Sequence, residues 1–216
     1  MKILLTGASG GIGKSILEKI SSSENEVIAP SSTELDLSCV DKINNFMDNQ
    51  NFDAVIHSAG INQITKFSDL DEKIIINHLK INAISLVSIC KNLKKENKII
   101  NVVAISSLYG FTAREMRLPY VTSKHALEGI VKSLSIDLSP NILINTIRPG
   151  FVDTPMTRKN NSEDKINQII NKIPAGDLVD SNQIALFAKF LIENNKSMTG
   201  QSITIDGGYS VGGYEK

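Results

Sequence analysis

Cysteine is scarce in this sequence, and the few cysteines present form no repeated pattern. The 216 residues hold only Cys39 and Cys90, which excludes a disulfide scaffold and a cysteine-rich zinc site. Both lie in apolar-patterned stretches, so we expect them to be reduced, as cysteines are in the cytosol. The three histidines have no metal-ligand spacing either, and we expect no metal site.

An excess of charge of either sign is also missing. Lys plus Arg and Asp plus Glu each count 23, which gives no electrostatic footprint for nucleic acid or an anionic membrane. No continuous apolar run approaches the roughly 18 residues that span a bilayer, and residues 1–5 do not resemble a signal peptide. With 41% hydrophobic residues, we expect a cytoplasmic protein with one domain over residues 1–216 that binds neither nucleic acid nor membrane.

Short apolar runs alternate with amphipathic stretches along the whole chain. This alternation predicts an α/β fold with one Rossmann-type doubly wound parallel sheet of six or seven strands and helices on both faces. We predict strands at 2–6, 26–29, 53–57, 98–105, 141–147 and 201–205. We predict helices at 12–20, after Ser38, from 71 to about 95, at 120–138 and at 183–193, with an irregular segment and a short helix in 151–174.

The connection after the second predicted strand is unusually short. A crossover between parallel strands needs about a dozen residues. Only about five residues separate Ala29 from Leu35, counted from the sequence. Residues 35–37 could therefore form a very short third strand that is reached by a tight loop.

Glycines cluster where the first strand gives way to the first helix. Gly7, Gly11 and Gly13 stand in the context that a dinucleotide fingerprint requires. The helix N-terminus then offers free N–H groups to phosphates. Because Gly10 is present too, both G-x-x-x-G-x-G and G-x-x-G-x-x-G can be read, and a tight turn without a ligand is the alternative.

Tyr120 and Lys124 lie four residues apart, on one face of a predicted helix. A neighbouring ammonium group lowers the pKa of a phenol from about 10 and lets it exchange protons. Such a pair alone is more often a solvated surface contact. Ser107 strengthens the functional interpretation, because a serine at a strand end and a tyrosine can polarise one carbonyl together, with Ser106 as a rival.

In this order and spacing the motifs resemble the single-domain branch of the short-chain dehydrogenase/reductase family, including enzymes similar to 3-oxoacyl-carrier-protein reductases. The resemblance extends over nearly the whole chain. It implies hydride transfer between a nicotinamide cofactor and a carbonyl or alcohol substrate. The residues that carry it are 6–13, 59–60, Asn82, Ser107, Tyr120, Lys124, Asn145, 148–150, Thr154, 199–200 and 206–208.

The resemblance also implies a role for each matching residue. Tyr120 would be the general acid/base, and Lys124 would lower its pKa and bind the nicotinamide ribose. Ser107 would hold the substrate oxygen, and Asn82 would support a proton relay. The cofactor-binding residues that we predict are Gly7, Ser9, Gly10, Gly11, Ile12, Gly13, Ser31, Ser32, Asp36, Leu37, Ala59, Gly60, Tyr120, Lys124, Pro149, Gly150, Val152 and Thr154.

Two features bear on histidine and on cofactor choice. The family's Asn-Asn-Ala-Gly stretch starts with His57 here, which we expect to be a buried or half-buried histidine with satisfied hydrogen bonds, whereas His78 and His125 should be solvated. After the second strand stand Ser31 and Ser32, with no carboxylate until residue 34. Serine hydroxyls can bind a 2′-phosphate, with Lys14 as a further candidate, so the sequence favours NADP over NAD. Alternatively, the serines only cap a turn.

Residues 108–119 and 155–175 should wall the substrate pocket. Arg114 and Arg117 could meet an anionic substrate there, although solvated loop arginines are commoner. The resemblance implies a homodimer or homotetramer formed through the helices at 71–95 and 120–138, which could instead simply cover the sheet. Two other functions stay open: a non-catalytic dinucleotide-binding sensor or scaffold, and an extended-type enzyme that modifies sugar nucleotides.

Overall fold

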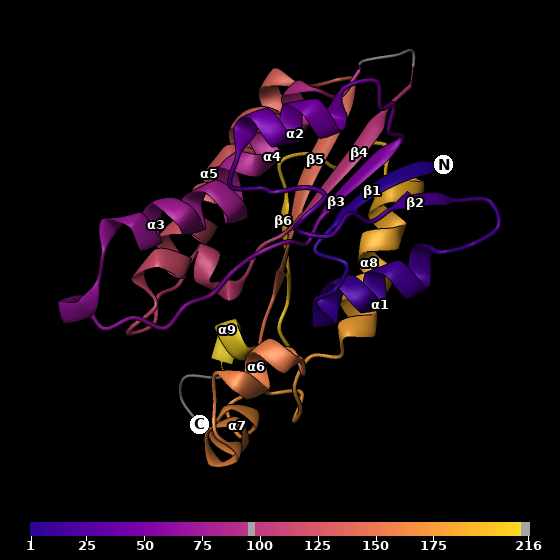
Figure 1. Ribbon diagram of the computed structural model, residues 1–216. Helices are drawn as coiled ribbons and strands as arrows, with labels where there is room; N and C mark the ends of the chain where they lie inside the picture. Colours follow the sequence, from indigo (N-terminus) through magenta and orange to yellow (C-terminus); the bar gives the residue numbers. More distant parts are fainter. Residues whose placement is uncertain (95–97, 213–216) are drawn as a thin grey trace.

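The computed structural model, which describes residues 1–94 and 98–212, contains a six-stranded sheet (Figure 1). Its strand order is β2-β1-β3-β4-β5-β6, and every pairing is parallel. This confirms the doubly wound α/β fold that the alternating pattern predicts. The strands are β1 (Lys2–Thr6), β2 (Glu26–Ile28), β3 (Ala54–His57), β4 (Ile100–Ile105), β5 (Ile142–Pro149) and β6 (Ser202–Ile205).

Helices connect these strands and cover both faces of the sheet (Figure 1). The α-helices are α1 (Gly11–Ile20), α2 (Val40–Met47), α3 (Glu72–Leu79), α4 (Ser85–Lys91), α5 (Leu118–Asp137), α6 (Pro155–Lys159), α7 (Glu163–Ile170), α8 (Ser181–Asn194) and α9 (Tyr209–Gly212). Short 3₁₀ turns are η1 (Phe67–Asp69) and η3 (Leu108–Gly110), and η2 (Lys80–Ile84) is a π-helical turn.

The sheet has a separate hydrophobic core on each face because successive side chains of a strand point to opposite sides. In β1, Leu4 packs with α2, α4 and α5 on one face, whereas Ile3 and Leu5 pack with α1 and α8 on the other. The strands β3, β4 and β5 divide their residues in the same way. Burial on both faces explains why these strands are apolar nearly throughout.

The expected short third strand at residues 35–37 is wrong. The chain leaves β2 through turns, in which the N–H groups of Glu34 and Leu35 both donate to the Ser31 carbonyl. Leu35 is buried in the core beneath α2, so its apolar character reflects packing and not strand pairing. The chain then enters α2 directly, and β2 forms the edge of the sheet.

The helix expected from residue 71 to about 95 is interrupted by the π turn η2 between α3 and α4, and residue 95 lies outside the described residues. The stretch Glu72–Lys91 is long and apolar enough to cross a membrane by length and composition alone, and 44% of its most apolar window is buried. Core helices of folded domains pass the same test. Here α3 packs against α5, and the turn carries the buried Asn82.

The carboxyl ends of β1, β3, β4 and β5 meet at one edge of the sheet. The register pairs Thr6 with His57, and Ile105 with Ile147 on the next strand. Beyond this edge lie α6, α7 and α9 (Figure 1). In open α/β sheets this edge is where ligands bind, so the site is sought there.

Candidate active site

The glycine turn between β1 and α1 is packed too tightly for side chains. Gly7 has a φ of +73°, and a Cβ there would lie 2.5 Å from the backbone N of Ala59. A Cβ on Gly13 would lie 2.0 Å from the carbonyl O of Gly7, and one on Gly11 would lie 2.6 Å from Cγ2 of Thr154. The glycines therefore let the turn pack against neighbouring protein elements, which brings the start of α1 to the edge of the sheet.

A cavity of about 680 Å³ opens in front of this turn. Its lining starts at Ser31 and Ser32 after β2 and reaches Tyr120 and Lys124 of α5. It includes these predicted cofactor residues: Gly7, Ser9, Gly10, Gly11, Ile12, Gly13, Ser31, Ser32, Asp36, Leu37, Ala59, Gly60, Tyr120, Lys124 and Thr154. Pro149, Gly150 and Val152 line the adjoining cavity instead.

The lining has the chemistry that a dinucleotide requires. Within the described residues, the first turn of α1 carries no acidic side chain, and no side chain caps its N-terminus at Gly10. Backbone N–H groups and the positive end of the helix dipole thus face the cavity and favour a pyrophosphate. An elongated cavity with a phosphate-binding turn at one side and a tyrosine–lysine pair at the other fits a nicotinamide dinucleotide.

Tyr120 lies in the first turn of α5, and the Ser107 hydroxyl is near enough to act on its phenol. Burial raises the pKa of Tyr120 to about 12, while the Ser107 hydroxyl and the charge of Arg117 act in the opposite direction. The sequence predicts a lowered pKa from Lys124. The direction differs because desolvation of the phenol is the larger effect in the protein without its ligands.

Lys124 lies one turn further along α5 and is buried. Its Nζ donates a hydrogen bond to the carbonyl O of Ile105 at 2.8 Å and lies 5.7 Å from the centre of the Tyr120 ring. Burial lowers the pKa of Lys124 to about 8, against the opposing effect of Glu128. The ammonium group is therefore still mostly protonated at neutral pH and can lose its proton within the physiological range.

Asn82 occupies the π turn and does not line the cavity. Its Oδ1 accepts from the N–H of Ile61 at 2.8 Å, and its Nδ2 donates to the carbonyl O of Ile61 and to Oγ of Ser123, both at 2.9 Å. A Cβ on Gly60 would lie 3.4 Å from Oδ1 of Asn82 and 3.6 Å from Nζ of Lys124. Asn82 thus fixes the backbone beside Lys124.

His57 ends β3 and is fully buried beneath the site. Its Nδ1 lies 2.9 Å from Oγ1 of Thr6, and its Nε2 lies 3.3 Å from Oγ of Ser85. Burial lowers the pKa of His57 to about 3, and the charge of Lys124 adds to this effect. A buried histidine with satisfied hydrogen bonds is what the sequence predicts here.

The expectation of two solvated histidines holds for one of them. His125 is exposed, but His78 is buried. Nε2 of His78 accepts from the N–H of Gln63 at 3.2 Å, and its Nδ1 lies 2.8 Å from the carbonyl O of Ile74. His78 therefore holds the loop after β3 against α3. Among residues 1–94 and 98–212, no group of three or more His, Cys, Asp or Glu residues could hold a metal ion.

A second, smaller cavity of about 120 Å³ lies on the other side of Tyr120. Ile12, Ser106, Tyr120, Thr154 and Met156 line both cavities, so the phenol stands between them. Much of the lining of the second cavity comes from the two segments that are predicted to wall the substrate pocket, 108–119 and 155–175. The lining residues from these segments are Leu108, Tyr109, Arg114, Arg117, Met156, Thr157, Asn160 and Asn161.

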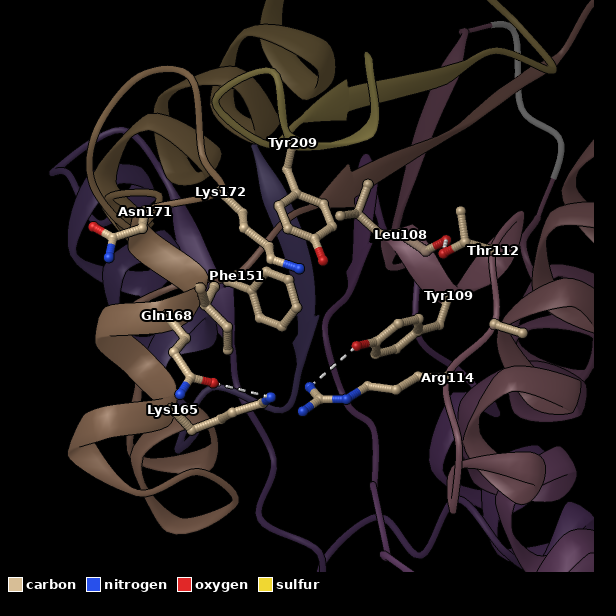
Figure 2. A pocket seen from close by; sticks show the side chains of 12 residues that line it. Leu108, Tyr109, Thr112, Arg114, Phe151, Lys165, Gln168, Asn171, Lys172 and Tyr209 are labelled. Atoms are coloured by element: carbon tan, nitrogen blue, oxygen red, sulfur yellow. Dashed lines mark hydrogen bonds between the residues drawn. The ribbon is translucent and has the colours of Figure 1, made fainter. Parts of the chain in front are cut away.

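A third cavity, of about 560 Å³, adjoins the second and shares Leu108, Tyr109, Arg114 and Phe151 with it. Figure 2 shows its side chains, which come from η3 and the loop after it, from Phe151 after β5, from α7 and the residues that follow it, and from α9. Sequence reasoning did not predict Asn62 or Glu34 as residues of these cavities. No motif contains them, and only the folded loops bring them to the site.

The fold agrees with three comparisons with known proteins. Residues 5–210 match the family model described as enoyl-(acyl carrier protein) reductase. The chain is 32% identical over 233 residues to the 3-oxoacyl-acyl-carrier-protein reductase FabG of Rickettsia typhi, with 95% of each chain covered.

Solved structures are similar as well. A short-chain dehydrogenase family protein from Francisella tularensis subsp. tularensis SCHU S4 has a TM-score of 0.87 and 29% identity, with 97% of this chain and 98% of that chain covered. A ligand-free aldohexose dehydrogenase from Thermoplasma acidophilum has a TM-score of 0.90 at 24% identity, with coverages of 97% and 94%, and supports the fold.

Proposed function

The chain belongs to the short-chain dehydrogenase/reductase family, and on this premise we propose which residues carry out its reaction. Members of this kind are NAD(P)-dependent oxidoreductases that transfer hydride between a nicotinamide cofactor and a small carbonyl or alcohol compound. We propose residues 1–216 as one dinucleotide-binding catalytic domain. Its catalytic residues would be Asn82, Ser107, Tyr120 and Lys124, and its cofactor would occupy the cavity in front of the glycine turn.

Tyr120 would move the proton that accompanies the hydride. Because burial raises the pKa of its phenol, Tyr120 is protonated at neutral pH and is suited to donate a proton to the substrate oxygen during reduction. The Ser107 hydroxyl, which lines the same cavity as that phenol, would donate to the same oxygen. A bound nicotinamide supplies the hydride and, when oxidised, a positive charge. Lys124 would return a proton to Tyr120 and hold the ribose.

The observation that carries this proposal is the position of Tyr120, which lines both cavities and shares the second one with Ser107. Tyr120→Phe should lower kcat by about 10²–10⁴-fold with little change in cofactor affinity. Nicotinamide absorbance over a panel of carbonyl compounds measures the first effect, and fluorescence titration of the reduced cofactor measures the second. Tyr109→Phe removes the neighbouring phenol, 6.1 Å away between ring centres, and should lose far less activity. Equal losses in both variants would refute Tyr120 as the acid.

The sequence favours NADP, and this preference stays a prediction to which the structure adds an opposing observation. The carboxylate of Glu34 accepts hydrogen bonds from the N–H and Oγ of Ser31, both within the cavity lining. Lys14 is not among the lining residues, and the lining contains only one lysine or arginine, Lys124. A carboxylate beside the adenosine ribose repels a 2′-phosphate and accepts from a 2′-hydroxyl. We therefore infer that Glu34 shifts the preference toward NAD.

Assembly and location are part of the same proposal. We propose a homodimer or homotetramer that buries the outer faces of the α3–α4 stretch and α5, where Ile76, Ile84 and Ile136 are exposed. A cytoplasmic location fits the bacterial reductase relatives. Light scattering of the purified chain and of Ile136→Lys tests the interface, since that substitution should reduce the molecular mass in solution. The comparisons give no support to the alternatives of a non-catalytic sensor and an extended-type enzyme.

A further inference from the structure

Arg117 is a buried guanidinium that no carboxylate of residues 1–94 and 98–212 neutralises. It is only 5% exposed, and its Nη1 donates to Oδ1 of Asn62 at 3.0 Å. None of the ion pairs within the described residues involves Arg117. A buried charge without a counter-ion is costly, and proteins usually keep one only where it is paired or hydrogen-bonded. The expectation of a solvated loop arginine is therefore wrong for Arg117.

Arg114 lies close to Arg117 and also has only neutral partners among the described hydrogen bonds. Its Nη1 donates to the Tyr109 hydroxyl and its Nη2 to Oδ1 of Asn161, both at 3.4 Å. The positive charge of Arg114 acts on Arg117. Both guanidinium groups line the cavity that contains Ser107 and Tyr120, and no Asp or Glu of the described residues lines it.

The adjoining cavity extends this positive environment. In Figure 2 the charged ends of Arg114, Lys165 and Lys172 all point into the same space, with Phe151 beside them. Again no Asp or Glu from the part of the chain that the structure describes belongs to the lining. Because the whole chain has no net charge, this concentration of cations is local. A concave surface of one sign raises the local concentration of oppositely charged ligands.

The backbone fixes Arg117 in this position. Met116, directly before it, has a φ of +58°, a left-handed conformation that is uncommon outside glycine. The carbonyl O of Met116 accepts from the N–H of Thr65 at 3.1 Å, and α5 starts immediately after Arg117. Such strain persists where the surrounding structure holds it, and it is concentrated at functional sites.

We propose that the substrate carries a carboxylate, which Arg117 binds together with Arg114 while Ser107 and Tyr120 engage the carbonyl oxygen of the same molecule. This inference rests on the proposed function. A planar guanidinium matches a carboxylate with two parallel hydrogen bonds. The cavity beside Tyr120 is small, so the carboxylate and the reacting carbon belong to one short segment, as in an oxo acid or the corresponding hydroxy acid. The rest of the substrate extends into the larger cavity.

The test compares 2-, 3- and 4-oxo acids with their methyl esters, for example acetoacetate with methyl acetoacetate. The unsubstituted protein should reduce the best acid with a kcat/KM about tenfold or more above that of its ester, since one desolvated ion pair readily supplies that factor. Arg117→Gln should bring acid and ester within about twofold of each other, mainly through a higher KM for the acid. An unchanged acid preference in Arg117→Gln, or an ester preferred by the unsubstituted protein, overturns the inference.

Two further variants guard against misfolding of Arg117→Gln. Asn62→Asp keeps Arg117 and gives it an internal carboxylate partner, so it should also reduce the acid preference. Glu115→Gln changes an exposed charge of the same loop and should leave the preference unchanged. If Asn62→Asp and Arg117→Gln both retain the preference, the carboxylate is bound elsewhere and the inference falls.

Calorimetry separates this inference from the proposed function. Tyr120→Phe, loaded with NAD or NADP, should still bind the preferred acid, and Tyr120→Phe combined with Arg117→Gln should bind it about tenfold more weakly. Binding that depends on Arg117 in a protein that reduces no compound would support the acid site and refute the oxidoreductase function. Turnover of acids and esters at equal rates would support the oxidoreductase function and refute the acid site.

Discussion

The cavity in front of the glycine turn and the cavities beyond Tyr120 are built by different means. The first is shaped by backbone: Gly7, Gly11 and Gly13 allow a turn that no side chain could replace, between the ends of two buried strands. The second and third are shaped by long side chains from loops and short helices, such as Arg114 and Lys165. A binding site for a common cofactor can thus remain constant while the substrate side varies.

The two sides also differ in charge. The cofactor side holds Glu34 and Asp36 at one end and Lys124 at the other. Beyond Tyr120, the described residues of the lining include arginines and lysines but no carboxylate. Tyr120 stands where these environments meet, and both Lys124 and Arg117 lie near it. Under our proposals, cofactor binding would rely on backbone donors, whereas substrate selection would rely on fixed positive charge.

The largest effect is expected for a substitution in the glycine turn, which shapes the first cavity. Gly13→Ala places a Cβ at 2.0 Å from the Gly7 carbonyl O, so the turn must open. We expect a loss of about 3 kcal/mol in the free energy of unfolding and a loss of cofactor binding, measured by urea denaturation and fluorescence titration. Gly129→Ala, in the exposed part of α5 with nothing within 4 Å of its Cβ, is the matched control. It should stabilise the protein by roughly 0.5–1 kcal/mol, and an equal loss in both variants would contradict the packing explanation.

The second prediction tests whether His57, which lies beneath the site, is shielded from water and stays neutral in the folded protein. Because the pKa of His57 is lowered to about 3 in the folded protein, only the unfolded chain takes up this proton below pH about 6.5. Stability should therefore fall as the pH drops from 6.5 toward 5, with His57 contributing about 1.4 kcal/mol per pH unit at the lower end. His57→Asn should remove that contribution in urea titrations between pH 5 and 7.

His125→Asn is the control for the second prediction, since that histidine is exposed. It should leave the slope of stability against pH nearly unchanged. His78, which is also buried with a lowered pKa, will keep part of the slope in His57→Asn. A slope that is the same in His57→Asn and in the unsubstituted protein would show that His57 is protonated in the folded state.

A third prediction concerns the boundary between the two sides. The positive charge of Arg117 lowers the pKa of Tyr120, so Arg117→Gln should raise it. Alcohol oxidation needs the phenolate, and its pH profile should therefore shift to higher pH. A neutral alcohol as substrate separates this effect from carboxylate binding. A profile that does not move would place the influence of Arg117 on substrate binding alone.

The smallest effect is expected at the adenosine end. Glu34→Gln removes a carboxylate but keeps an acceptor for Ser31, and it should raise the ratio of kcat/KM for NADP over NAD by about threefold, because an exposed charge is screened by solvent. Glu24→Gln, at the far end of β2, is the control. An unchanged ratio in Glu34→Gln would move the determinant of cofactor choice to another residue.

The cavity in front of the glycine turn, which is shaped by backbone, could be predicted from the sequence to a large extent. The glycine spacing, the apolar strands and the interval between Tyr120 and Lys124 are local patterns, and the parallel sheet brings the strand ends together. Leu35 misled the prediction of a third strand, because an apolar residue between turns fits a strand or a core contact equally well. For the same reason the edge of the sheet could not be located from the pattern.

The two cavities beyond Tyr120, which are shaped by side chains, could largely not be predicted from the sequence. Whether Arg117 or His78 is buried depends on loops that are distant in sequence, since Asn62 and Gln63 supply their partners. The direction of the Tyr120 pKa was also not predictable from the Tyr–Lys interval. The interval shows that an ammonium group is near, but the opposing cost of desolvation depends on how deeply the folded chain encloses the phenol.

The direct passage from β2 to α2 has a consequence for how this protein can change. The stretch after β2 that lines the cavity in front of the glycine turn is a few turns anchored by Leu35, and no strand of the described residues lies outside it. Substitutions or insertions there leave the opposite, tyrosine-bearing end of the cavity untouched. Evolution can therefore change the preference between NAD and NADP without changing the reaction at the other end of the cavity.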